Sequence, residues 1–163
     1  MADVNKMHVE TERKFLVKDA SYKAHAVKSY RIKQGYIAHD GGNTVRVRVR
    51  DNEGFLTIKG PSFGGMSRSE WEIGISLADA DALLQLCHGG FIDKTRHLVP
   101  CGDGLFWEVD EFHGDNDGLV MAEIEVPSVD TAFPRPSWLG EEVTGDRRFY
   151  NSYLTRCPYK AWK

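Results

Sequence analysis

Residues 44–50 read TVRVRVR, and this strict alternation constrains the fold more than any other feature of the 163-residue chain. Successive side chains of a β-strand point to opposite faces, so three valines share one face and three arginines share the other. A two-faced pattern of this kind recurs in further segments, at 8–17, 30–38, 55–59, 68–75, 92–99, 105–112 and 119–126. The sequence therefore predicts about eight strands.

One face of nearly every predicted strand carries charge, and only one face can point into a closed sheet. A small barrel or sandwich with its valines inside and its charges in water satisfies the alternation. On a strand face that contacts water, however, positive and negative side chains are usually mixed, because neighbouring like charges repel one another. We therefore favour an inverted barrel, whose charged faces line a central tunnel while helices and a partner subunit cover the apolar faces. Because carboxylates coordinate Mg²⁺ or Mn²⁺ and arginine or lysine binds phosphate oxygens, such a tunnel suits a metal-bound polyanion.

Helical signals are few. The segment 76–90 opens with Ser76 three residues before Asp79, which resembles a capping box, and we expect its helix to stop at Gly89 and Gly90. Segment 19–27 predicts a short helix, and 146–154 predicts an amphipathic one that plugs or flanks the barrel. Trp71, Trp107 and Trp138 are expected to be packing residues. The sequence shows no linker or low-complexity tract, so we expect residues 1–163 to form one mainly β (α+β) domain.

Composition excludes several classes of protein. The 21 Lys and Arg nearly balance the 24 Asp and Glu, which argues against a general nucleic-acid binder. No apolar run approaches the ~20 residues that a membrane helix needs, and the N-terminus has no signal-peptide core. Three widely spaced cysteines suggest neither a disulfide framework nor a zinc site, so a reducing cytoplasm fits best. Motifs typical of zinc proteases, serine hydrolases and P-loop proteins are missing.

Eight charged elements along the chain occur in the order of a known family: E-x-E-x-K at 10–14, then RVR, LTIKG, SRSEWE, KTR, WEVD, AEIEV and GEEVTGD. On these residues the chain resembles the CYTH superfamily of triphosphate tunnel metalloenzymes, over nearly its whole length. The resemblance implies an eight-stranded antiparallel barrel that forms a tunnel, is usually dimeric, and acts on triphosphate compounds with Mg²⁺ or Mn²⁺. Members of the family include inorganic triphosphatases, thiamine triphosphatases, class IV adenylate cyclases and RNA triphosphatases.

The resemblance also implies roles for individual residues. The metal-binding carboxylates would be Glu10, Glu12, Glu123 and Glu125, which with Lys14 make up the expected catalytic set. The phosphate-binding cations would be Lys14, Arg46, Arg48, Lys59, Lys94 and Arg96. A second metal ion or the attacking water would be held by Glu70, Glu72, Glu108 and Asp110. Two residues stay open: Tyr36 is either a core or a tunnel residue, and Arg50 either faces inward or faces solvent at a strand end.

The expected reaction is metal-assisted hydrolysis of a terminal phosphoryl group. Inorganic tripolyphosphate is the preferred substrate, because a chain this short has little material outside the barrel to recognise a base or a thiazole ring. Two alternatives stay open: a class IV adenylate cyclase, and a polyphosphate-binding module without turnover. The retained carboxylate pairs favour catalysis, since binding a polyanion needs cations more than acids.

Overall fold

The computed structural model describes residues 8–162, and strands dominate it. The nine strands are β1 (His8–Val17), β2 (Lys28–Asp40), β3 (Asn43–Arg50), β4 (Glu53–Lys59), β5 (Ser67–Ile75), β6 (His88–Gly102), β7 (Leu105–Phe112), β8 (Val120–Glu125) and β9 (Leu139–Glu142). The α-helices are α1 (Leu77–Leu84) and α2 (Asn151–Leu154). Short 3₁₀ helices are η1 (Ala20–His25), η2 (Gly114–Asn116), η3 (Arg147–Phe149) and η4 (Tyr159–Ala161).

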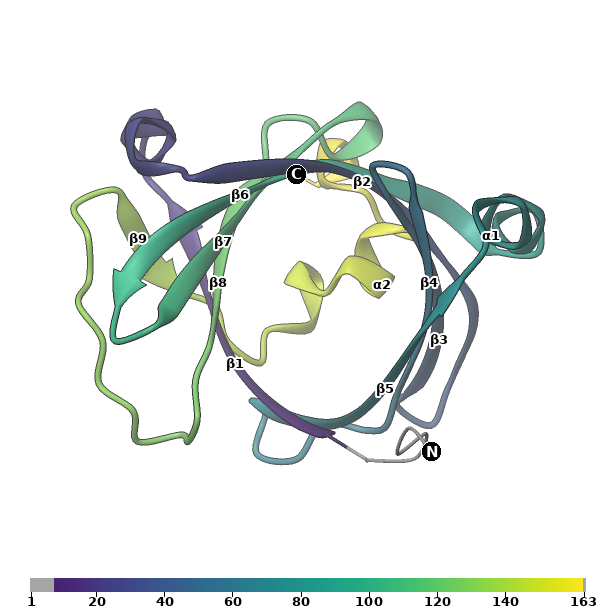
Figure 1. Cartoon of the computed structure of the whole chain (residues 1–163), viewed down its shortest axis with the longest axis horizontal. Coiled ribbons are helices and arrows are strands. Elements are labelled where there is room, and N and C mark those ends of the chain that lie inside the picture. The colour runs from purple at the N-terminus through teal and green to yellow at the C-terminus, as the bar shows by residue number, and fades with distance from the viewer. Residues whose placement is uncertain (1–7, 163) are drawn as a thin grey trace.

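Eight of the strands close into an antiparallel barrel. The hydrogen-bonded order is β5-β4-β3-β2-β6-β7-β8-β1, and β1 returns to pair with β5. The first half of β1 pairs with β5, and its second half pairs with β8 on one side and with β9 on the other. The predicted eight-stranded barrel is confirmed, and β9 is an addition on its outer edge. In Figure 1 the strands form a ring with α2 inside its outline and α1 outside it.

The barrel is inverted, as the rows of like charge predicted. Val47 is fully buried and packs against Ala80 and Leu84 of α1, on the outside of β3. Its neighbours in sequence, Arg46 and Arg48, face the inside. The alternation of TVRVRVR therefore separates an outer apolar layer from an inner charged one.

The largest apolar cluster covers the outside of the barrel. It is centred on Phe15 and Trp107, whose rings lie edge to face with centroids 5.6 Å apart, and it includes Trp138 from the loop before β9. Trp107 and Trp138 are packing residues as expected, whereas Trp71 is 38% exposed on the outer face of β5.

A second apolar cluster closes part of one end of the barrel from within. Ile92, Phe112 and Met121 continue the inward faces of β6, β7 and β8, and they pack against Phe149 and Leu154 of the C-terminal segment. That segment therefore enters the end of the barrel, which confirms that it plugs the barrel.

The helices differ in detail from those predicted. The Ser76 hydroxyl accepts a hydrogen bond from the Asp79 amide, as the capping pattern implied, but α1 ends at Leu84. Gly89 and Gly90 belong to β6 instead, where the Gly90 amide donates to the carbonyl of Thr155. Segment 19–27 forms η1, and 146–154 is divided into η3 and α2.

Within residues 8–162 no helix combines the length and apolar character needed to cross a membrane.

Candidate active site inside the barrel

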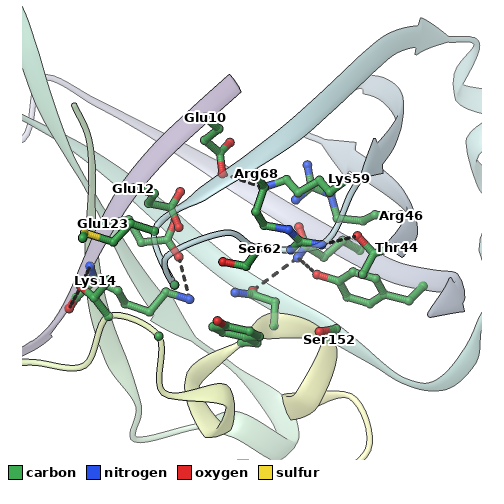
Figure 2. A pocket seen from close by; sticks show the side chains of 18 of the residues that line it. Glu10, Glu12, Lys14, Thr44, Arg46, Lys59, Ser62, Arg68, Glu123 and Ser152 are labelled. Atoms are coloured by element: carbon green, nitrogen blue, oxygen red, sulfur yellow. Dashed lines mark hydrogen bonds and ion pairs between the residues drawn. The ribbon is translucent and has the colours of Figure 1, made fainter. Parts of the chain in front are cut away.

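The inside of the barrel holds a cavity of about 100 Å³, which we call the central cavity. Figure 2 shows carboxylates from β1 and β8 facing cationic side chains from β3, β4 and β5 across it. Ten of the residues named from the sequence line this cavity: Glu10, Glu12, Lys14, Tyr36, Arg46, Arg48, Lys59, Lys94, Arg96 and Glu123. These residues come from six strands, so barrel closure rather than any local motif brings them together.

Three carboxylates crowd one wall of the central cavity. The side chain of Glu12 has no hydrogen bond or ion pair among the described residues, and burial together with the charges of Glu123 and Glu10 raises its pKa well above the usual value, against the smaller opposing effect of Lys59 and Lys14. Glu123 is itself buried, yet its pKa is lowered because Lys14 and Arg96 lie close enough to outweigh the burial. A carboxylate held beside two others without an ion-pair partner of its own is a group whose ionised form a cation would stabilise.

Glu10 belongs to a pair of acids that share a proton. Burial alone would raise its pKa, but a hydrogen bond from Glu70 and the ammonium of Lys59, 2.9 Å away, lower it to about 2. Burial and the same hydrogen bond raise the pKa of Glu70 to about 8. At neutral pH Glu70 is therefore the protonated member and Glu10 the charged one.

The opposite wall carries guanidinium groups with unused hydrogen-bonding capacity. The Nε atom of Arg46 is buried without a hydrogen-bond partner, although its Nη2 donates to Thr57 and lies 3.6 Å from Glu72. Arg48 donates to the neutral amide oxygen of Gln34 at 2.8 Å, and burial and the charge of Arg46 lower its pKa to about 9. A buried donor without an acceptor, beside a second buried cation bound only to an amide, indicates that an anion binds between them.

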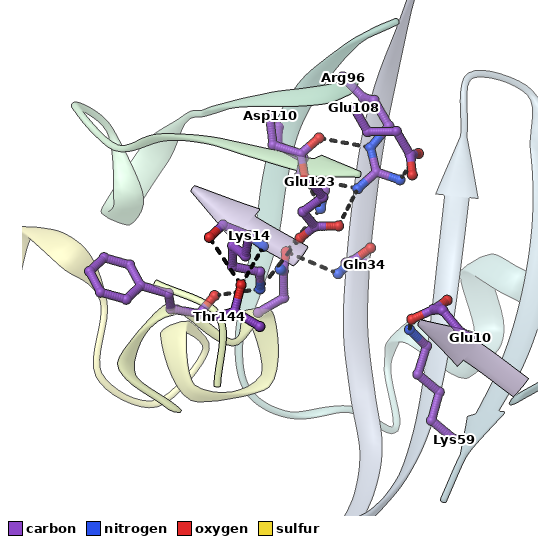
Figure 3. Close-up of polar contacts among 12 residues, drawn as sticks. Glu10, Lys14, Gln34, Lys59, Arg96, Glu108, Asp110, Glu123 and Thr144 are labelled. Atoms are coloured by element: carbon purple, nitrogen blue, oxygen red, sulfur yellow. Dashed lines mark hydrogen bonds and ion pairs between the residues drawn. The ribbon is translucent and has the colours of Figure 1, made fainter. Parts of the chain in front are cut away.

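Arg96 is the centre of a buried network, shown in Figure 3. It donates two hydrogen bonds to Asp110, at 2.7 and 2.9 Å, and one to Glu108 at 2.6 Å, and it lies 3.6 Å from Glu123. Lys94 donates to the same Asp110 at 2.8 Å. Because both oxygens of Asp110 accept hydrogen bonds, this residue orients the two cations, and its role in holding a second metal ion or the attacking water stays a prediction.

The C-terminal segment adds groups to the site. The ammonium of Lys14 donates to the carbonyl of Phe149 at 2.9 Å and lies 5.5 Å from the ring centre of Tyr150. Asn151 accepts from Lys94 at 2.9 Å and from Gln34 at 3.3 Å. This segment therefore fixes the orientation of side chains on β1, β2 and β6.

Sequence reasoning missed several of the lining residues. Besides Gln34 and Asn151 these are Thr44, Ser62, Met66, Arg68, Thr144, Tyr150 and Ser152. Three of them had a usable signal, because Gln34 shares the inward face of β2 with Tyr36, Thr44 shares that of β3 with Arg46, and Arg68 shares the charged face of β5 with Glu70. The others lie on loops or in the C-terminal segment, where strand alternation gives no direction.

Some predicted residues do not line the central cavity. Glu70, Glu72 and Glu108 contact lining residues without lining the cavity themselves. Arg50 lies at the end of β3, against the rings of Tyr30 and Phe55 and 3.7 Å from Glu53, and it does not reach the central cavity. Tyr36 lines the cavity and is therefore a tunnel residue.

The predicted metal-binding carboxylates do not all lie together in one cluster. Glu125 is exposed at the end of β8, opposite Glu12 in the sheet, and its role as a metal ligand stays a prediction. Within residues 8–162 no group of three or more His, Cys, Asp or Glu is arranged to hold a metal ion. The carboxylates point instead to the lysines, as the pairs Glu10–Lys59 and Glu123–Lys14 show.

Comparison with known proteins agrees with this geometry. A family model described as the CYTH domain matches residues 8–150. An inorganic triphosphatase of Acetivibrio thermocellus is 46% identical over 158 residues, which cover 96% of this chain and 99% of the relative. An inorganic triphosphatase of Nitrosomonas europaea is 37% identical over 148 residues, 89% of this chain and 95% of the relative.

The fold gives the same result. A crystal structure of an inorganic triphosphatase superposes with a TM-score of 0.63 at 33% identity, covering 90% of this chain and 97% of the other. The charged tunnel, the matching family model and these relatives lead to one conclusion: the chain belongs to the CYTH domain family.

Proposed function

We propose that this protein hydrolyses the terminal phosphoryl group of inorganic tripolyphosphate, giving pyrophosphate and phosphate, with the help of Mg²⁺ or Mn²⁺. The observation that carries the proposal is the buried Nε atom of Arg46, which lacks a hydrogen-bond partner and lies next to Arg48, whose own hydrogen bond goes to a neutral amide. A chain of phosphates supplies the acceptors that these donors lack. Two relatives named inorganic triphosphatases support the same substrate.

The cations of the central cavity would bind and align the phosphates. Arg46 and Arg48 on β3 face Lys14 on β1, and Lys59, Lys94 and Arg96 complete the ring of positive charge. Asp110 holds Lys94 and Arg96 in fixed directions, so these two need little reorganisation when phosphate oxygens arrive. Charges fixed in advance stabilise a transition state without a cost of reorientation.

The crowded carboxylates fit a divalent cation. Glu12 is the best candidate ligand, because its carboxylate has no hydrogen bond or ion pair among the described residues and faces the charges of Glu10 and Glu123. Glu10 and Glu123 would leave their lysines to join it, with Glu125 at the strand end as the fourth proposed ligand. A bound divalent ion would polarise phosphate oxygens and lower the pKa of the attacking water. Glu70, Glu72 and Glu108 remain proposals for orienting that water.

A direct test compares Arg46→Gln with Arg50→Gln, because both arginines lie on β3 and only the first lines the central cavity. A buried charge-assisted hydrogen bond contributes about 1.5–3 kcal/mol, so Arg46→Gln should raise the KM for tripolyphosphate roughly 10- to 150-fold. Arg50→Gln should leave KM within about twofold. Equal effects of the two substitutions would refute the site.

The same assay separates the alternatives. Phosphate release should require Mg²⁺ or Mn²⁺ and stop with excess EDTA. With ATP as substrate, production of cyclic AMP and pyrophosphate would assign the protein to the cyclases. Binding of tripolyphosphate without release of phosphate would identify a binding module.

We also propose that two copies of the chain associate. Val9, Ile58, Trp71 and Ile73 lie on the outer faces of β1, β4 and β5 and are 38–54% exposed. Ile58 and Trp71 are cross-strand partners, so these side chains form one apolar surface. Trp71→Glu should lower the molar mass measured by light scattering from that of a dimer to that of a monomer, and an unchanged mass would exclude this surface.

The proposed location is the cytoplasm. Cys87, Cys101 and Cys157 are free thiols, which suits a reducing compartment. Cell fractionation with the tagged protein tests this, and recovery outside the cytoplasmic fraction would overturn it.

A further inference from the structure

A second cavity of about 620 Å³ lies next to the central cavity, and we call it the vestibule. Its walls are the turn between β2 and β3, the loop between β4 and β5, and the C-terminal segment around α2. The basic side chains that line it are His39, Arg68, Arg147 and Arg156, its other titratable groups are Tyr150 and Tyr153, and no Asp or Glu of residues 8–162 lines it. The vestibule is therefore a basic chamber.

The vestibule adjoins the central cavity. Six residues line both spaces: Ser62, Gly65, Arg68, Gly145, Tyr150 and Ser152. Gly65 and Gly145 face each other at this boundary, where a Cβ added to Gly65 would lie 3.7 Å from the Cα of Gly145. Both glycines have a positive φ that other residues rarely adopt, and neither places a side chain between the two turns. Figure 2 shows Arg68 and Ser62 among the side chains that line the central cavity.

The arginines of the vestibule lack anionic partners. Arg68 donates to the carbonyl oxygens of Gly60 and Gly42, at 2.8 and 3.0 Å, so neutral acceptors hold its guanidinium in place. Arg147 and Arg156 are exposed, and among the described residues neither side chain has a hydrogen bond or an ion pair. Arg148, in contrast, pairs with Asp146 at 2.7 Å. The vestibule thus retains positive charge that the adjacent surface neutralises.

The charges of the three vestibule arginines all act on His39. The pKa of His39 is lowered by burial and by the charges of Arg156, Arg68 and Arg147. At the opposite end of the barrel the strand topology places Glu125, at the end of β8, and Glu53, which lies 3.7 Å from Arg50. The vestibule end is therefore the end at which the described arginines attract a polyanion.

We propose that the vestibule is the entrance for the polyphosphate substrate, and that Arg147 and Arg156 capture it before Arg68 directs it into the central cavity. This proposal rests on the proposed function for its substrate. Capture by charge raises the rate of association rather than the rate of the chemical step, and steering of this kind changes association rates 10- to 10³-fold. Its strength falls as salt screens exposed charges, with a screening length of about 10 Å at 0.1 M.

The test compares the double variant Arg147→Gln/Arg156→Gln with Lys18→Gln/Lys160→Gln. The control removes the same two charges from exposed lysines outside the vestibule. At low ionic strength the arginine variant should lose about tenfold in kcat/KM for tripolyphosphate, with kcat within twofold. The loss should disappear at about 0.5 M salt, and the control should match the wild type throughout. An equal loss in both variants, or a fall in kcat, would overturn the proposal.

Two further measurements keep the result interpretable. Arg147→Lys/Arg156→Lys keeps the charges, so it should retain most of kcat/KM, and a loss as large as that of the glutamine variant would overturn capture by charge. If the wild-type protein does not turn over tripolyphosphate, the proposed function fails, and calorimetric binding of tripolyphosphate at low salt then tests the vestibule alone. Binding that weakens only in the glutamine variant supports the vestibule, and equal binding in both variants refutes it.

Discussion

Asp110 and Asp93 form similar pairs with arginine in very different surroundings. Asp110 receives two hydrogen bonds from Arg96 at 2.7 and 2.9 Å, and Asp93 receives two from Arg31 at 2.7 and 2.8 Å. The Asp110 side chain is 0% exposed, whereas those of Asp93 and Arg31 are 40% and 60% exposed. Asp110→Asn and Asp93→Asn therefore measure how much burial adds to the same geometry.

The expected cost can be worked out from the partners left behind. Removing one partner of a buried ion pair typically costs about 3–5 kcal/mol, because a charge is stranded in the interior. Arg96 keeps Glu108 and Glu123 as neighbours, and Lys94, whose pKa burial lowers to about 7, can release its proton. We therefore expect Asp110→Asn to cost about 3 kcal/mol, the lower end of that range. The exposed pair should contribute at most about 1 kcal/mol.

Thermal unfolding followed by calorimetry measures this difference. For a chain of this size 1 kcal/mol shifts Tm by roughly 2–4 °C, so Asp110→Asn should lower Tm by about 6–12 °C and Asp93→Asn by no more than about 4 °C. Urea unfolding at pH 7 gives the free energies directly. If the two substitutions have equal effects, burial does not determine the strength of the Asp110 pairs, and its assigned orienting role is wrong.

Three further predictions concern titrating groups. Glu12→Gln should raise Tm in the absence of divalent ions. The increase should grow as pH rises above the ordinary pKa of a glutamate, because the folded state raises the pKa of Glu12. Turnover should fall about 10²-fold, and unchanged turnover would exclude Glu12 as a ligand. Because the folded state lowers the pKa of Lys94 to about 7, the unfolded chain binds more protons than the folded one between about pH 7 and 10. The free energy of unfolding of the wild type should therefore rise by up to about 1.4 kcal/mol per pH unit in this range relative to Lys94→Gln. The same pH dependence of the unfolding free energy in both proteins, measured with urea, would contradict this. Glu70→Gln should be more stable than the wild type by an amount that grows from the ordinary pKa of a glutamate up to about pH 8 and is constant above it, because over this range the unfolded carboxyl has lost its proton while the folded one keeps it; a difference in Tm that does not change with pH would contradict this.

The fold could be predicted because its main signal is local. Each strand has its own alternation, and Val47 lies outside with Arg46 and Arg48 inside, as the pattern of TVRVRVR requires. The prediction of one continuous helix at 146–154 was wrong, because this segment makes a contact with a strand far away in the sequence. The carbonyl of Phe149 accepts a hydrogen bond from the ammonium of Lys14, and Tyr150 adopts an extended backbone that separates η3 from α2.

The site was predictable for residues on strands and not for residues on loops. Lys14 and Glu123 face inward because they alternate with the buried apolar residues Phe15, Ala122 and Ile124, and Glu10 shares the strand face of Lys14. Asn151 and Ser62 take part only because the C-terminal segment and the loop between β4 and β5 fold over the barrel end. No periodicity within those segments specifies that contact.

The charges of the central cavity are paired with one another, which has a consequence for how ligands bind. Glu10 and Lys59 lie 2.9 Å apart, so a phosphate chain that takes Lys59 frees Glu10 for a metal ion, and the two ligands should assist each other. Lys59→Met should therefore have effects of opposite sign: Mn²⁺ alone should bind more tightly, because Glu10 has lost its counter-charge, whereas tripolyphosphate should bind more weakly. Lys18→Met removes an exposed lysine outside the cavity and should change neither affinity. Calorimetric titration of each ligand separately measures both effects, and weaker binding of both ligands by Lys59→Met would show that Lys59 supports the site as a whole rather than competing with the metal ion for Glu10.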